Sequence, residues 1–242
     1  MHHEMRWKLF VFDFDGVLVD SYSCLPVIYE LLAEHLELGK KVDYFVQRAI
    51  TYEDMEDAKG NYDRRKWWPA FFREFDPSFS EGSLDGLLKD FWRHRIRLTS
   101  IMEGARELLV FLKERGSKIS IICGSDGQPS MKKRRIKESG LSRFFGHILI
   151  VGEDVSDRKQ GFSILLEKFR VTGKETVFIE DKPDPINEVR SINNSISTFK
   201  VEFDGPLKLA WSGNCVSSFK IKSLVELKQY LAIRKMHKKR ED

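Results

Sequence analysis

Short, continuous apolar runs recur along the chain and are separated by longer stretches in which apolar residues are spaced as in a helix. The runs are LFVFDF (residues 9–14), KISIICGS (118–125), HILIVG (147–152) and TVFIED (176–181). Runs of this kind are typical of strands that are buried on both faces. Helical spacing follows in ARELLVFLKERG (105–116) and GFSILLEKF (161–169). The alternation predicts an α/β fold, with a parallel sheet covered by helices on both faces.

One long segment, from about residue 22 to residue 99, contains no convincing strand and breaks this alternation. Four stretches in it read as amphipathic helices, namely CLPVIYELLAEHLEL (24–38), VDYFVQRAI (42–50), RRKWWPAFFREF (64–75) and LDGLLKDFWRHRIRL (84–98). We therefore expect a core made of residues 1–21 and 100–242, with residues 22–99 inserted as a helical domain over the sheet's carboxyl edge. The aromatic residues Trp67, Trp68, Phe71 and Phe72 are interpreted as the packing core of that domain rather than as a substrate pocket.

Composition and charge narrow the classes of partner. The 242 residues include 41 Lys and Arg against 37 Asp and Glu, and a net charge of +4 does not by itself indicate a nucleic-acid binder. Cys24, Cys123 and Cys215 have neither disulfide-framework nor zinc spacing, which fits a reducing cytosol. Because no run approaches the roughly 20 apolar residues of a membrane span and no signal peptide is evident, we expect a cytoplasmic protein without a membrane partner. The final RKMHKKRED (234–242) is interpreted as a solvated helix end.

Two aspartates follow the first predicted strand, one residue apart. Residues i and i+2 of a strand point to the same side, so Asp13 and Asp15 can share one site. Like charges this close repel unless a cation lies between them, and Mg²⁺ takes carboxylate oxygens. An aspartate can also act as a nucleophile, and a second one can exchange protons with the leaving group and water. Gly16 permits a sharp turn there. A solvent-facing acidic turn is the alternative for this pair alone.

Other predicted strands end in polar residues at the same edge, where ligands bind in parallel sheets. Ser125 precedes Gly127 and Pro129, so a hydroxyl and a helix N-terminus can together bind phosphate, although a simple helix cap explains the residues equally well. Glu180 and Asp181 end another strand and can complete a magnesium site or merely begin a proline-rich turn. Lys159 precedes Asp181 by 22 residues and can neutralise a phosphate.

The order of these groups carries a family resemblance. DFDGVLVDS, then a strand ending in Ser, then Lys159, then IED resembles the haloacid dehalogenase superfamily, in the subgroup with a helical cap after the first motif, which includes phosphoglycolate phosphatase and β-phosphoglucomutase. The resemblance, which spans about residues 8–231, implies a Rossmann-like catalytic core and a Mg²⁺ cofactor. It implies that Asp13 is the nucleophile and a metal ligand, and that Asp15 is the general acid/base with its carbonyl on the metal. It further implies that Ser125 holds the phosphoryl oxygens and that Lys159 steadies the charge. Asp181 would ligate Mg²⁺, and Glu180 would support the metal directly or through water.

The sequence departs from the family pattern in three places. Gln160 stands where proline is common, and Pro185 stands where many members have an aspartate, with Asp184 one position short. A shifted alignment would put Cys123 in place of Ser125, but a thiol is a poorer hydrogen-bond donor to phosphate.

The resemblance implies a Mg²⁺-dependent phosphatase that hydrolyses a small phosphomonoester through an aspartyl-phosphate. The alternatives are a phosphomutase and a catalytically weak binding or regulatory member, whereas Asp15 argues against a dehalogenase. We expect a small phosphorylated substrate, no nucleic acid, and a monomer or weak homodimer. The cap residues that can meet an anionic substrate are Arg64, Arg65, Lys66, Arg93, Arg95 and Arg97.

Overall fold

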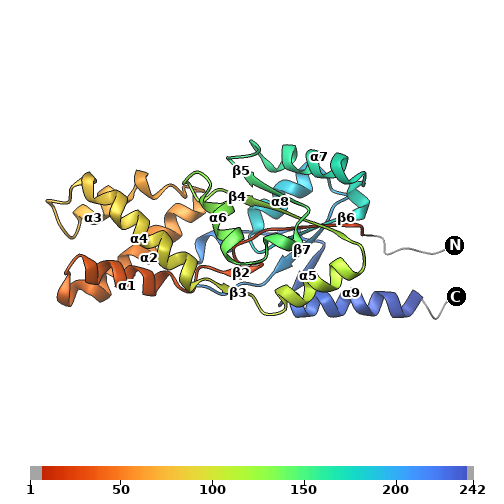
Figure 1. Ribbon diagram of the computed structural model, residues 1–242, viewed down its shortest axis with the longest axis horizontal. Coiled ribbons are helices and arrows are strands. Elements are labelled where there is room, and N and C mark those ends of the chain that lie inside the picture. The colour runs from red at the N-terminus through yellow and green to blue at the C-terminus, as the bar shows by residue number, and fades with distance from the viewer. Residues whose placement is uncertain (1–6, 239–242) are drawn as a thin grey trace.

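The computed structural model describes residues 7–238, and the side chains of residues 7–233. Two lobes lie side by side in Figure 1, one built from a sheet with flanking helices and the other from helices alone. The charged C-terminal run (234–242) that was interpreted as a solvated helix end lies outside the described side chains. None of the described helices is both long enough and apolar enough to cross a membrane.

Within residues 7–238, six parallel strands form the sheet, in the order β5-β4-β1-β6-β7-β8. The four strands predicted from the sequence are present as β1 (Leu9–Phe12), β4 (Lys118–Gly124), β5 (His147–Val151) and β6 (Thr176–Glu180). The sequence did not identify β7 (Ser197–Val201) or β8 (Phe219–Ile221). The predicted parallel α/β fold is therefore confirmed, with β1 near the middle of the sheet.

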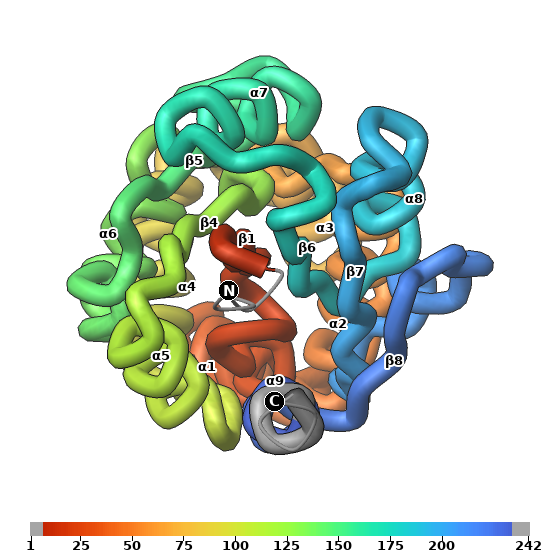
Figure 2. The backbone as a smooth tube through the Cα atoms, turned by 90° about the vertical axis from the view of Figure 1, so that its right-hand side faces the viewer, coloured from red at the N-terminus to blue at the C-terminus, as the bar shows by residue number. Residues whose placement is uncertain are grey.

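Helices cover both faces of this sheet. α7 (Arg158–Phe169) and α8 (Pro183–Ile192) lie on one face, and α5 (Ala105–Glu114), α6 (Met131–Glu138) and α9 (Leu224–Lys238) lie on the other, as Figure 2 shows. Alternate residues of β1 point to opposite faces, so Phe10 and Phe12 pack with α5 and α9 while Leu9 and Val11 pack with α7 and α8. Burial on both faces explains why β1 is wholly apolar.

The second lobe contains the four helices expected between residues 22 and 99. They are α1 (Leu25–His35), α2 (Val42–Ala58), α3 (Trp68–Arg73) and α4 (Leu84–Leu98). A short antiparallel ribbon, β2 (Val19–Asp20) with β3 (Ser100–Ile101), joins this lobe to the sheet. We refer to residues 22–99 as the cap, and its limits remain those predicted from the sequence.

The cap has an aromatic core of its own. Trp68, Phe71 and Phe72 are buried in it, as interpreted from the sequence. Trp67 is also nearly buried and stacks on Tyr52, but one side of it lines the pocket between the lobes. One of the four aromatic residues therefore serves both the core and the pocket wall.

Candidate active site

The pocket lies where the carboxyl end of β1 meets the cap, and Asp13 and Asp15 line it. The Asp13 amide donates to Ile179 O at 2.9 Å, which continues the β1–β6 ladder to the aspartate itself. Gly16 then turns the chain with a φ of +78°, and its amide donates to Val19 O at 2.8 Å. A side chain at Gly16 would overlap the Asp181 carboxylate, so glycine lets the two strand ends approach each other.

Three buried carboxylates from two neighbouring strands converge at this edge. Oxygen atoms of Asp13, Glu180 and Asp181 lie within 4.8 Å of one another. Within the described part of the chain, Glu180 Oε2 and Asp181 Oδ1 are buried without a hydrogen-bond partner. Burial and the mutual repulsion of these groups raise the pKa of Asp13 and of Glu180 well above the usual range, and burial raises the pKa of Asp181 to about 6. Orphaned oxygens in an all-carboxylate cluster fit a hard divalent cation.

The Asp15 side chain does not join this cluster, because it points to two cations on α6. It forms ion pairs with Lys132 and Arg135 and accepts a hydrogen bond from Ser21 Oγ. Asp126 shares both cations, at 2.8 Å from Lys132 and 2.9 Å from Arg135. Burial alone would raise the pKa of Asp15, but Arg135 and Lys132 hold it well below its usual range. Asp15 is therefore a carboxylate in this arrangement, and the contribution of its backbone carbonyl to a metal site remains a prediction.

Ser125 follows β4 and lines the same pocket. Its hydroxyl donates to Glu153 at 2.9 Å and accepts from the Gly127 amide at 3.2 Å. Gly127 has a φ of +73°, and a side chain there would overlap the cap backbone at residues 62–63. Cys123, the alternative to Ser125, is buried in the hydrophobic core.

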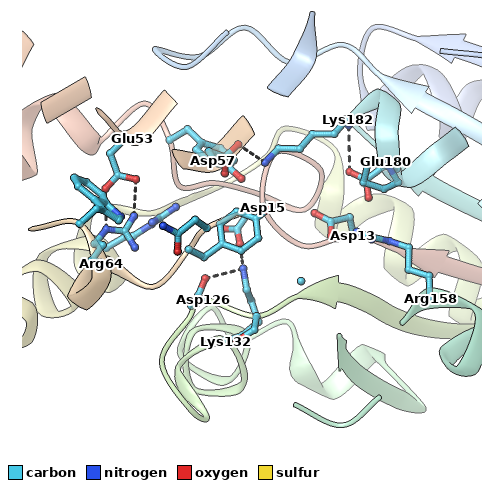
Figure 3. Close-up of a pocket in the computed structure, with 18 residues that line it drawn as sticks. Asp13, Asp15, Glu53, Asp57, Arg64, Asp126, Lys132, Arg158, Glu180 and Lys182 are labelled. Atoms are coloured by element: carbon cyan, nitrogen blue, oxygen red, sulfur yellow. Dashed lines mark hydrogen bonds and ion pairs between the residues drawn. The ribbon is translucent and has the colours of Figure 1, made fainter. Parts of the chain in front are cut away.

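Lys159 does not enter the pocket, which corrects the placement expected from the sequence. Its side chain is exposed, whereas the preceding residue, Arg158, lines the pocket. The start of α7 is fixed by Asp157, which accepts a hydrogen bond from the Gln160 amide at 2.8 Å. Successive helical residues point about 100° apart, so Arg158 faces the carboxylates while Lys159 faces solvent. Figure 3 shows Arg158 beside Asp13.

The cap side of the pocket carries ion pairs of its own. Arg64 binds Glu53 with two hydrogen bonds of 2.7 Å, and Lys182, which follows Asp181, reaches across to Asp57 of α2 at 2.6 Å (Figure 3). Of the six cap cations named from the sequence, Arg64 and Arg95 line the pocket. The side chains of the other four are exposed, and these residues are Arg65, Lys66, Arg93 and Arg97.

The departure from the family pattern at residues 184–185 also lies at this site. Pro185 lines the pocket at the position where many members have an aspartate, and Asp184 is exposed outside it.

The sequence did not identify several residues that contact the carboxylates of the site. Lys132 and Arg135 lie in the run MKKRRIKE, which reads as a solvated helix, although their spacing of three places both on one face of α6. Trp211 donates from Nε1 to Asp181 Oδ2 at 2.7 Å and belongs to the loop between β7 and β8, which no strand prediction had located. For these residues, the only indication in the sequence was the helical spacing of Lys132 and Arg135 in α6.

A comparison of the sequence with models of known protein families identifies the family of this chain. The model for haloacid dehalogenase-like hydrolases matches residues 7–186, which include every carboxylate of the cluster. The chain belongs to the haloacid dehalogenase-like hydrolases. The phosphoserine phosphatase of Wolinella succinogenes is 31% identical over 142 residues, which are 59% of this chain and 57% of that protein. The chain therefore matches little more than half the length of this curated relative.

Solved structures of the same family share the fold. A candidate β-phosphoglucomutase from Thermotoga maritima matches with a TM-score of 0.73 and 18% identity, over 93% of this chain and 98% of that one. A candidate family hydrolase from Bacillus subtilis, solved with bound magnesium, matches with a TM-score of 0.68 and 19% identity, over 94% and 99%. At these identities the likeness extends to the fold, including the cap, and no further.

Proposed function

We propose that the protein is a Mg²⁺-dependent phosphatase that hydrolyses a small phosphomonoester through an aspartyl-phosphate on Asp13. The observation that carries the proposal is the cluster of Asp13, Glu180 and Asp181, with two buried oxygens that lack a partner among the described residues. A phosphatase fits the family and the name of the Wolinella relative.

The carboxylate cluster would hold the metal ion, with Asp13 and Asp181 as ligands and Glu180 in direct contact or through water. A bound Mg²⁺ would neutralise charge on the phosphoryl oxygens and on the carboxylates. The Bacillus subtilis structure contains magnesium, which supports the choice of metal here. Because the pKa values of the three carboxyls are raised without a cation, metal binding should displace protons from them.

Asp13 would attack phosphorus while the bond from phosphorus to the leaving oxygen breaks. Ser125 and Arg158 would bind the non-bridging phosphoryl oxygens, with Arg158 taking the role that the sequence assigned to Lys159. Arg158 fits because its guanidinium lies in the field of Glu180 and Asp13, which together with Glu188 outweighs burial and raises its pKa. It therefore carries a permanent positive charge beside the nucleophile.

Asp15 would give a proton to the leaving oxygen and then take one from the water that cleaves the acyl phosphate. The ion pairs with Lys132 and Arg135 suit the second task, because they keep Asp15 ionised. The first task requires a protonated carboxyl, so we expect these pairs to loosen when substrate binds.

The test is a panel of phosphate monoesters with and without Mg²⁺, in which both inorganic phosphate and any isomerised product are measured. We expect phosphate release that stops when the metal is chelated and resumes when Mg²⁺ is restored. Full turnover in excess chelator would contradict the metal dependence, and an isomerised sugar phosphate without phosphate release would favour a phosphomutase.

A further inference from the structure

The cationic groups that line the pocket are almost all paired with carboxylates. Five cationic side chains line it, namely Arg64, Arg95, Lys132, Arg158 and Lys182. Four of them have a carboxylate partner within 3 Å, the partners being Glu53, Asp126, Glu188 and Asp57 respectively. The fifth, Arg95, forms no ion pair with any described residue, and its Nε is buried without a hydrogen-bond partner.

Burial makes this lone charge costly. Arg95 is 5% exposed and lies on α4 of the cap, packed among the rings of Tyr22, Phe91 and Trp92 at 5.6–5.8 Å. Its closest polar contact is a long hydrogen bond of 3.4 Å from Nη2 to Ser21 Oγ. Aromatic rings attract a guanidinium weakly, but they do not neutralise it, and a buried charge is ordinarily paired. Arg95 helps to lower the pKa of Asp15, so it lies in the field of that carboxylate, but among the described residues no carboxylate pairs with the guanidinium directly.

The position of Arg95 indicates which part of a substrate would supply that charge. Ser21 Oγ connects Arg95 to Asp15, since it donates to the Asp15 carboxylate and accepts from Arg95. In the proposed reaction Asp15 contacts the leaving oxygen, so Arg95 lies on the leaving-group side of Asp15. The phosphoryl group lies at Asp13, where Arg158 and Lys132 are the main cations and Arg95 is not among the dominant charges.

We propose that Arg95 binds a carboxylate on the leaving group, so that the substrate is a phosphorylated small carboxylic acid. This inference rests on the proposed phosphatase function. A carboxylate fits the planar fork of a guanidinium and would give Arg95 the direct ion pair that it does not form with any described residue. A second phosphate carries more charge than one guanidinium offsets, and Glu53 and Asp57 in the same pocket would repel it.

Matched substrate pairs test the proposal. 3-Phosphoglycerate and glycerol 3-phosphate differ by a carboxylate in place of a hydroxymethyl group, and O-phosphoserine and phosphoethanolamine differ by the presence of a carboxylate. p-Nitrophenyl phosphate, which has none, reports the basic phosphatase activity. For the wild type we expect kcat/KM to favour the carboxylate member of at least one pair by roughly tenfold to a hundredfold, the usual effect of a charged hydrogen bond.

Two variants of Arg95 and one matched control complete the experiment. Arg95→Gln should reduce the preference within that pair to near unity, and Arg95→Lys, which keeps the charge but not the fork, should retain part of it. Arg97→Gln, an exposed position on the same helix, should keep the wild-type ratio. If Arg95→Gln does not fold, the ratio measured for Arg95→Lys decides.

The possible failures are distinguishable. Hydrolysis of p-nitrophenyl phosphate without a preference in either pair would overturn the carboxylate site and leave the phosphatase intact. An equal loss for both members of the preferred pair in the Arg95 variants would also overturn it, because Arg95 would then serve the phosphate or Asp15. No hydrolysis of any of the five esters would contradict the phosphatase itself, and with it this proposal.

Discussion

The indole of Trp211 donates a hydrogen bond of 2.7 Å to Oδ2 of Asp181, and Asp181 Oδ1 has no partner among the described residues. One oxygen of the carboxylate is thus fixed while the other stays available beside Asp13 and Glu180. Partners that orient a metal ligand in this way commonly change metal affinity 10- to 100-fold when they are removed. The loop that carries Trp211 also contacts the cap, since the amides of Lys208 and Leu209 both donate to Asp54 at 2.8 Å.

We therefore predict that Trp211→Phe weakens Mg²⁺ binding by about tenfold or more, because phenylalanine keeps the ring but cannot donate. Isothermal titration calorimetry with Mg²⁺, or electron paramagnetic resonance with Mn²⁺, measures this without any turnover. Leu209→Ala is the control, since that side chain is half exposed on the same turn. Equal affinities for Trp211→Phe and the wild type would show that the hydrogen bond does not orient Asp181.

Arg158 lines the pocket whereas its neighbour Lys159 is exposed, so the two form a matched pair of variants. Arg158→Ala should lower kcat/KM by about a hundredfold or more, because a guanidinium beside a transferring phosphoryl group stabilises charge in the transition state. Lys159→Ala should leave kcat/KM within about twofold of the wild type, as expected for a solvated surface charge. Steady-state kinetics on one phosphomonoester is sufficient. A larger loss for Lys159→Ala would restore the assignment made from sequence.

Lys182 and Asp57 join the two lobes across the pocket at 2.6 Å, and both side chains are largely buried. Removing one partner leaves the other charge uncompensated, so Asp57→Asn should make the cap open more readily about the β2–β3 ribbon. We expect faster hydrogen exchange at the pocket-facing end of α2 and a larger radius of gyration by small-angle scattering. Asp54→Asn serves as the comparison, because Asp54 lies in the neighbouring contact between the cap and the amides of Lys208 and Leu209. An unchanged exchange rate in Asp57→Asn would mean that the ion pair does not hold the cap.

Asp126 provides a test by pH, because Arg135 and Lys132 outweigh its burial and lower its pKa. A carboxyl with a depressed folded-state pKa stabilises the fold above its unfolded pKa, and this stabilisation is lost as pH falls through the folded pKa. Asp126→Asn should therefore cost roughly 3 kcal/mol at pH 7, and the difference from the wild type should shrink below about pH 4. Guanidinium unfolding at pH 7 and pH 3.5 measures it. A difference that does not change with pH would assign the effect to packing.

The sheet could be predicted where its strands are buried on both faces, because such strands are continuous apolar runs. β1 and β6 are of this kind. β7 reads STFKV and β8 has only three residues, FKI, with an exposed lysine. A strand that is short or partly solvated leaves little hydrophobic pattern to read. For the same reason the loop that carries Trp211 was not predicted, since it connects β7 and β8, which the sequence did not identify.

The carboxylates of the site could be predicted because each ends a recognisable strand, and strand ends share one edge of the sheet. The cations could not be predicted in the same way, since their placement depends on helix phase. A shift of one residue at the start of α7 decides between Arg158 and Lys159. Charged residues in a polar run such as MKKRRIKE are ordinarily solvated, and here tertiary packing buries two of them against Asp15.

In the proposed reaction Asp13 carries the phosphoryl group while Asp15 moves protons. Intact-protein mass after rapid acid quench, with p-nitrophenyl phosphate as substrate, tests it most directly. We predict that Asp15→Asn accumulates one phosphoryl group. The p-nitrophenolate of the substrate leaves without a proton, so the first step still occurs. Hydrolysis of the phosphorylated enzyme is slowed by roughly 10²–10⁴-fold, because the amide that replaces this carboxylate cannot activate water. Asp13→Asn should show no adduct and no turnover. A phosphoryl adduct on Asp13→Asn would contradict the account.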